Sequence, residues 1–157
     1  MSMKNRRYPF VLLLVVPAMT WMPGSLMAHG KATGIVKERM QLMKTMGKQM
    51  RTIGLMAKGK IPFSAETVGN RAEKIRLSST KIQALFPEGS LHKPTEALPV
   101  IWEQWDQFLS LAKQLEQEAE TLEKVAVQGD EQTTLAQFTK LGETCSGCHT
   151  DFREKDE

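Results

Sequence analysis

Apolar residues recur every three or four positions in four stretches of the chain, at about residues 34–58, 64–86, 99–127 and from residue 130 onward. This spacing lines one face of an α-helix with apolar side chains. No strand-like alternation of useful length interrupts the pattern. Four helices joined by short connections predict an all-α fold, an antiparallel up-down-up-down four-helix bundle, which can hold a cofactor between facing helices.

Residues that begin and end helices flank these stretches. Ser64 and Asp130 are good N-caps, because their side-chain oxygens can accept hydrogen bonds from the first turn. Gly59, with Pro62 just beyond it, is suited to ending the first helix. The segment 87–90, Pro-Glu-Gly-Ser, is expected to end the second helix.

The first 28 residues have a different composition. Three basic residues within the first seven positions precede an almost wholly apolar run at 9–19, and small residues lead up to Ala28. This order is typical of a secretory signal peptide. The run is shorter than the roughly 20 apolar residues of a membrane span. We therefore expect a signal peptide at 1–28, cleavage after Ala28, and a mature domain of residues 29–157 that does not span a membrane.

The charge of the mature chain is balanced but unevenly distributed. The whole sequence has 21 basic and 18 acidic residues, and the three basic residues that the signal peptide removes make the two equal. The balance gives no reason to expect nucleic-acid binding. Basic residues concentrate in 29–76 and acidic residues in 96–157. This asymmetry either orients a redox partner or represents solvated faces with little energetic effect.

The pentapeptide Cys145-Ser146-Gly147-Cys148-His149 near the C-terminus carries the chemistry. It has the form of a c-type haem attachment site, in which two thiols bond to the haem vinyl groups and the histidine ligates the iron. On a helix these three side chains lie on one face within about one turn. A thioredoxin-like site needs a βαβ context, and a structural zinc site needs four ligands. The motif therefore predicts one covalent haem c, and haem attachment outside the bacterial cytoplasm points to the periplasm.

Three further segments, together with this motif, resemble one known family. The segments are Arg39-x-x-x-Met43-Lys44-x-x-Gly47, Phe86-Pro87-x-Gly89-Ser90 and Ile101-Trp102-x-x-Trp105-x-x-Phe108, followed by Cys145-x-x-Cys148-His149-x-x-Phe152-Arg153. In their order and in the C-terminal place of the haem motif, they are similar to cytochrome c′, the class II c-type cytochromes. The resemblance implies a four-helix bundle over nearly the whole mature chain.

The resemblance also implies a ligand opposite the histidine. In low-spin members of the family a methionine lies four residues after the arginine of the first helix, and here that position is Met43. A thioether there makes the iron six-coordinate and raises its potential. The first helix is rich in methionine, which is a common core filler. Met40 or Met46 as the ligand, and an open high-spin site, therefore stay as alternatives.

Two arginines are also implied to serve the haem. The resemblance places Arg39 beside a haem propionate, where a guanidinium can bind a carboxylate bidentately. It places Arg153 beside the proximal imidazole, where its charge would tune the iron. The alternatives are a solvated Arg39 on a basic face and an Arg153 in the chain's tail paired with an acidic residue. Trp102 and Trp105 are expected to pack rather than to react.

These features together predict a soluble periplasmic electron-transfer cytochrome with one His/Met-ligated haem. Its partners would be unidentified redox proteins. Family members often dimerise through the first two helices, but the surface charge there could oppose a homodimer, so monomer and dimer both stay open. The alternative is a high-spin cytochrome c′ that binds nitric oxide or carbon monoxide. An enzymatic function such as peroxidase chemistry is not expected, because the first helix has no histidine to act as a distal acid or base.

Overall fold

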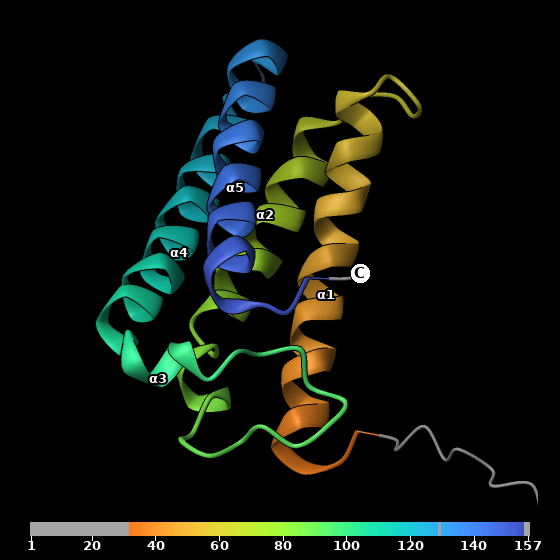
Figure 1. Ribbon diagram of the computed structural model, residues 1–157. Coiled ribbons are helices and arrows are strands. Elements are labelled where there is room, and N and C mark those ends of the chain that lie inside the picture. The colour runs from red at the N-terminus through yellow and green to blue at the C-terminus, as the bar shows by residue number, and fades with distance from the viewer. Residues whose placement is uncertain (1–31, 129, 156–157) are drawn as a thin grey trace, which may run out of the picture.

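The computed structural model describes residues 32–128 and 130–155, which form helices joined by short loops (Figure 1). The helices are α1 (Gly34–Ala57), α2 (Ala65–Ser79), the 3₁₀ helix η1 (Gln83–Leu85), α3 (Val100–Glu103), α4 (Trp105–Val127) and α5 (Glu131–Phe152). Within the described residues the β pairing consists of one bridge between Ala97 and Arg153. The predicted all-α fold is confirmed. The predicted signal peptide lies outside the described residues.

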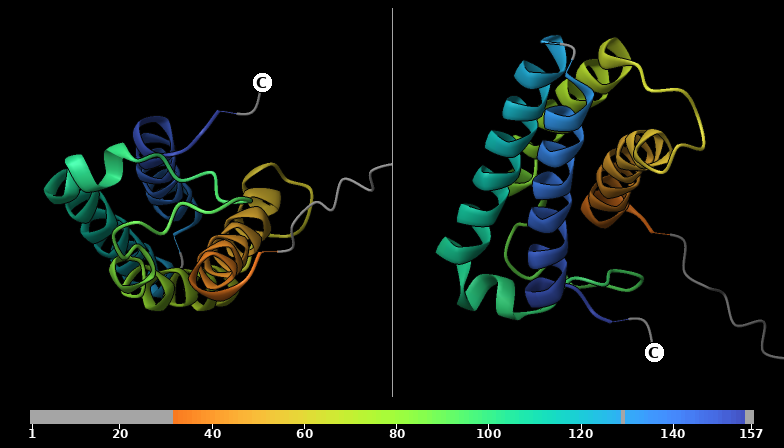
Figure 2. Two further views of the ribbon diagram at one scale, coloured as in Figure 1. Left: turned by 60° about the horizontal axis from the view of Figure 1, so that its bottom comes forward. Right: turned by 90° about the horizontal axis from the view of Figure 1, so that it is seen from above.

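The four long helices form an up-down-up-down bundle whose members pack unequally. The packing of α2 on α4 and of α4 on α5 is extensive, whereas α1 packs mainly on α2 and touches α5 little. Figure 2 shows α1 inclined away from α4 and α5. The bundle is therefore a tightly packed set of three helices with α1 held at one side, and the space for a cofactor lies between α1 and α5.

The core follows the apolar periodicity of the sequence. The largest side chains with almost no exposed surface come from every layer of the bundle, and they include Ile53, Ile75, Ile101, Leu122 and Leu141. Burying side chains of this size stabilises a fold by about 1.5–3 kcal/mol each relative to leaving them exposed. No helix in the described part of the chain is long and apolar enough to cross a membrane.

The predicted helix caps are present. Ser64 Oγ accepts a hydrogen bond from the backbone N–H of Thr67 at 3.1 Å. Asp130 accepts hydrogen bonds from the N–H groups of Gln132 and Thr133. Gly59 follows α1 with a φ of +63°, a left-handed conformation that glycine adopts without strain.

The second helix ends earlier than the apolar spacing predicted. It stops at Ser79 instead of continuing to Phe86. The hydroxyls of Ser78, Ser79 and Thr80 donate to the carbonyls of the preceding turn, and this bonding competes with the helical ladder. A turn and η1 carry the chain onward, and they keep Ile82 and Phe86 buried. The periodicity therefore continued past the end of the helix.

The third helix is broken where the sequence predicted a continuous one. Gln104, with φ −119° and ψ 44°, separates α3 from α4. In α3, the indole N–H of Trp102 donates to the carbonyl of Phe86 at 3.1 Å, and Ile101 is fully buried. These contacts fix α3 to the segment after α2. The break has no proline or glycine as a signal in the sequence, so only the tertiary contacts account for it.

Candidate haem site

A cavity of about 510 Å³ lies between α1 and α5, with walls contributed by α2 and α4. Its volume is within the range of pockets that hold a cofactor. Most of its lining is apolar, and the α1 side includes the thioethers of Met40, Met43, Met46 and Met50. The cavity lies where α1 and α5 fail to pack on each other, so it is part of the fold's architecture.

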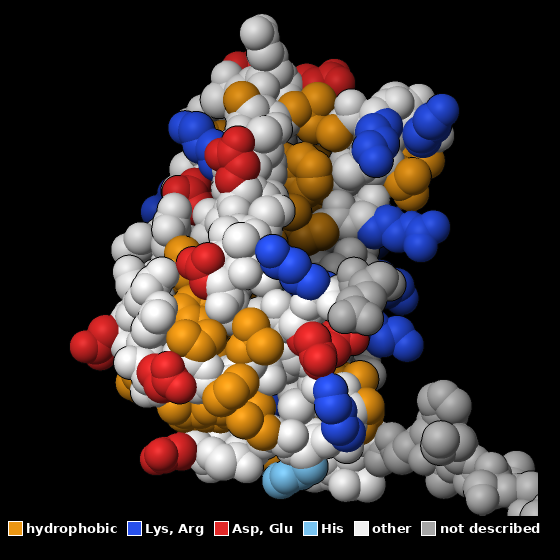
Figure 3. All heavy atoms as spheres, viewed as in Figure 1, with side chains coloured by type: hydrophobic (Ala, Val, Ile, Leu, Met, Phe, Trp, Pro, Cys, Tyr) orange, Lys and Arg blue, Asp and Glu red, His pale blue; other side chains and the backbone are white. Residues whose placement is uncertain are grey.

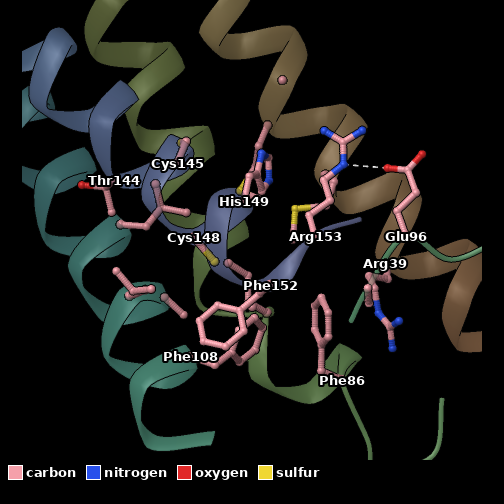
Figure 4. Close-up of a pocket in the computed structure, with 18 of the residues that line it drawn as sticks. Arg39, Phe86, Glu96, Phe108, Thr144, Cys145, Cys148, His149, Phe152 and Arg153 are labelled. Carbon is pink, nitrogen blue, oxygen red and sulfur yellow. Dashed lines mark hydrogen bonds and ion pairs between the residues drawn. The ribbon is translucent and has the colours of Figure 1, made fainter. Parts of the chain in front are cut away.

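The α5 wall brings the haem motif together. Cys145, Cys148 and His149 all line the cavity (Figure 4), as the spacing on one helical face predicted. Both cysteines are half-buried free thiols. Burial raises the pKa of Cys145, and it raises the pKa of Cys148 to about 11. The two sulfurs are therefore neutral thiols in an apolar wall.

The imidazole of His149 is available as a ligand. His149 lines the cavity and keeps part of its surface exposed to solvent. Burial by the surrounding protein lowers its pKa, the charge of Arg153 lowers the pKa further, and the carboxylate of Glu96 raises it by less. The neutral form is therefore favoured at pH 7, and a neutral imidazole nitrogen is what binds a metal.

The α1 wall places Met43 and Gly47 on the opposite side of this cavity. Met43 is half-buried and lines the cavity. A Cβ built on Gly47 would meet no atom within 4 Å, and one on Gly142 of α5 would lie 3.9 Å from Cε of Met50. The glycines thus leave free space in the walls beside Met43. A flat macrocycle attached to α5 would find room in this space.

An aromatic cluster closes the cavity below Cys148 (Figure 4). The ring centroids of Phe86 and Phe108 are 4.8 Å apart, and those of Phe108 and Phe152 are 5.4 Å apart in an edge-to-face arrangement. Trp105 stacks on Phe108 at 5.5 Å. Such pairs contribute about 0.5–1.5 kcal/mol each beyond their burial. The packing role expected for Trp105 agrees with its contact to Phe108.

The structure gives Arg39 an anchoring role that the sequence did not reveal. Its side chain is 3% exposed, so the alternative of a solvated arginine is wrong. Nε donates to the carbonyl of Leu85 at 3.0 Å, and Nη1 donates to the carbonyl of Ser90 at 3.2 Å and to Oγ1 of Thr95 at 3.0 Å. Nη2 donates to Oγ of Ser90. The guanidinium also lies 4.0 Å from the ring centroid of Phe86. Arg39 therefore ties the loop after η1 to α1.

Replacing Arg39 by alanine should lower the free energy of unfolding by about 3 kcal/mol, because four hydrogen bonds disappear and buried acceptors lose their partners. Urea unfolding followed by circular dichroism measures the change. Lys37→Ala, an exposed position on the same helix, is the control and should change stability by less than about 0.5 kcal/mol. Equal midpoints for the two variants would contradict the anchoring role.

Arg153 is held by the loop that precedes α3. Its Nε lies 2.6 Å from Oε2 of Glu96, and the backbone N–H of Leu98 donates to the carbonyl of Phe152. The pairing with an acidic residue agrees with the alternative weighed for Arg153, although the partner was not foreseen. Glu96 also lines the cavity. The acid and the arginine are 57 positions apart, so no local pattern connects them.

The fold and this cavity define a helical-bundle protein with a c-type haem site, and comparison with known proteins gives the family. The sequence model described as Cytochrome C′ matches residues 34–153, and the chain belongs to the cytochrome c′ family. It is 35% identical to cytochrome c′ of Pararhodospirillum photometricum over 120 residues, which cover 76% of this chain and 95% of that protein. It is 33% identical to cytochrome c-554 of Cereibacter sphaeroides, with 78% and 94% covered.

A solved structure shows the same relationship in three dimensions. Cytochrome c′ from Rhodopseudomonas palustris superposes with a TM-score of 0.73 at 32% identity, covering 80% of this chain and 100% of the other. The predicted four-helix bundle of the cytochrome c′ family is confirmed. Proteins of this family carry a single covalent haem c, and so does this chain.

Proposed function

We propose that this protein is a periplasmic electron-transfer cytochrome in which Cys145 and Cys148 hold the haem through thioether bonds and His149 and Met43 ligate its iron. The bound haem supplies a centre that accepts and releases one electron. The observation that supports the assignment best is that Met43 and the Cys-x-x-Cys-His motif line one cavity from opposite helices.

The chain's own residues suit electron transfer with little rearrangement. Met43 offers a soft, neutral sulfur, which favours ferrous iron and raises the potential. His149 offers a neutral imidazole from the last turn of α5. With His149 and Met43 both as ligands, the iron would need little change of ligation between oxidation states and would offer no open position to an added gas. The apolar walls keep water away from the reacting centre.

The two arginines act around this centre. Arg153 would place a cation next to His149. Its ion pair with Glu96 largely balances the charge of this cation. Arg39 has five N–H donors, of which four donate to η1 and the loop that follows it. The remaining N–H would reach a haem propionate. The propionate contact of Arg39 stays a prediction, as does the cleavage after Ala28, and a homodimer through the first two helices stays open.

Visible spectra of the purified protein test the His/Met assignment. We expect a low-spin spectrum in the ferric and the ferrous states, and no spectral change when carbon monoxide is added to the ferrous protein. A high-spin ferric protein that binds carbon monoxide would overturn the Met43 assignment. It would favour the alternative function, a cytochrome c′ that binds nitric oxide or carbon monoxide.

A further inference from the structure

One face of α1, together with its C-cap residue Lys58, carries a row of cations. Lys37, Lys44, Lys48, Arg51 and Lys58 follow one another at intervals of seven, four, three and seven, so they lie on one side of the helix. All five are exposed. We call these five residues the basic stripe, and Figure 3 shows blue side chains gathered along this edge of the molecule.

The basic stripe has no acidic counterpart within the described part of the protein. The ion pairs of the described residues all lie elsewhere, at Arg76–Glu123, Lys93–Glu154, Lys113–Glu116, Lys124–Glu120 and Arg153–Glu96. Glu38 is the only acidic residue of α1, and no cation lies three or four positions from it. The acids of α4 are therefore partly neutralised, whereas the positive field of α1 is not.

The stripe works against the stability of its own helix. Like charges at i, i+4 (Lys44 and Lys48) and at i, i+3 (Lys48 and Arg51) repel each other. Lys37 lies in the first turn, where the helix dipole disfavours a cation and no acidic residue compensates. The stability of the fold therefore does not explain this row of cations. An external anionic partner would offset both the repulsion between the cations and the unfavourable dipole interaction of Lys37.

The stripe also borders the opening of the haem cavity. Met40 and Gly47 of α1 line the cavity and are exposed, so they form its rim on this side. On the helical wheel Lys44 lies one turn after Met40, Arg51 lies one turn after Gly47, and Met43 lies just behind these two rim residues. Figure 3 shows recessed apolar atoms between α5 and α1, with basic side chains along the α1 side. A partner bound to the stripe would face the cavity.

From this arrangement we infer that the basic stripe is the docking surface for the acidic patch of a redox-partner protein, which exchanges electrons with the haem past the Met40–Gly47 rim. This inference rests on the proposed electron-transfer function. Electron transfer weakens steeply with distance, so a partner must approach the haem closely. A cationic row beside the cavity opening steers an acidic surface to that place. Binding to a membrane surface would not require the cations to lie beside the cavity opening, so this position favours a redox partner.

Stopped-flow reduction of the ferric holoprotein by the hydroquinone form of a flavodoxin, an acidic flavoprotein, tests the inference. The wild-type rate should fall as salt is added. The variant Lys44→Glu/Lys48→Glu should react at least about tenfold more slowly at low salt and lose most of its salt dependence. The matched control Lys113→Glu/Lys124→Glu changes the net charge equally on α4, which packs on α2 and α5. It should stay within about threefold of wild type.

Several results would overturn the inference. Equal losses in the two double variants would mean that only the net charge matters, and no loss in either would mean that the stripe is not used. Self-association of the wild type at low salt, abolished by Lys44→Glu/Lys48→Glu, would assign the stripe to a second copy of the chain. Binding to phosphatidylglycerol vesicles without a change in the flavodoxin rate would assign it to a membrane.

A separate experiment tests the proposed electron-transfer function independently of the docking surface. Reduction of each protein by dithionite in 1 M salt, where charges are screened, should be equal in all variants if the haem is redox-active. A wild-type protein that dithionite leaves ferric would contradict electron transfer itself. Thermal melts should show that both variants are folded. Lys44→Glu/Lys48→Glu should melt close to wild type, and Lys113→Glu/Lys124→Glu should melt slightly lower because it loses two exposed ion pairs.

Discussion

Replacing Met43 by alanine should convert the ferric haem from low-spin to high-spin and allow carbon monoxide to bind the ferrous protein. The side chain lies on the α1 wall, half-buried, across the cavity from Cys145, Cys148 and His149. Alanine cannot reach the iron, and no other side chain replaces the thioether at this helical position. The reduction potential should also fall, because the thioether stabilises the ferrous state. Absorption spectra with and without carbon monoxide, together with a redox titration, measure all three changes.

Two neighbouring methionines provide matched controls. Met46 is 7% exposed, and its truncation to alanine should lower the free energy of unfolding by about 2–5 kcal/mol, as in other buried sites. Met40 is 41% exposed, so Met40→Ala should change stability much less. Neither substitution should alter the spin state. If Met40→Ala or Met46→Ala opens the haem to carbon monoxide while Met43→Ala does not, the ligand has been assigned to the wrong residue.

The helices were predictable because each carries its own periodic pattern and its own caps. The apolar spacing gave the bounds of α1 and the start of α5 correctly, and Ser64 and Asp130 act as caps in the structure. The pattern gave no sign of the end of α2 at Ser79 or of the break at Gln104. In both places buried residues continue at helical spacing although the helix stops. At the end of α2 the Ser79 hydroxyl bonds to the carbonyl of Arg76 in the preceding turn, and beside the break at Gln104 the Trp102 indole bonds to the carbonyl of Phe86.

The site likewise contains residues that the local sequence pattern predicts and residues that only the folded chain brings together. Cys145, Cys148 and His149 are close in sequence, so the helical repeat alone places them on one wall. Glu96 and the loop acceptors of Arg39 are far from their partners in sequence, and only the folded chain brings them together. The cavity itself depends on how α1 leans from α5, which is a property of packing across the whole bundle.

Replacing both Cys145 and Cys148 by serine should abolish covalent haem attachment and leave a loosely packed helical protein. Acid-acetone extraction followed by intact-mass measurement should show one retained haem in the wild type and none in the variant. The cavity of about 510 Å³ would then lack packing partners on every wall. Because α1 touches α5 little, a haem in the cavity would supply most of the contact between these two helices. We expect α1 to detach first.

Three measurements distinguish this outcome from simple local damage. Far-ultraviolet circular dichroism should keep most of its helical signal, whereas the thermal transition should broaden and its midpoint should fall. Hydrogen exchange should lose protection in α1 before it does so in α2 and α4, which pack extensively on each other. Ser146→Ala, an exposed change within the same motif, should leave mass, melting and exchange unchanged. A haem-free double variant that melts sharply at the wild-type temperature would contradict the prediction. It would show that the bundle packs without its cofactor, with α1 packed directly on α5.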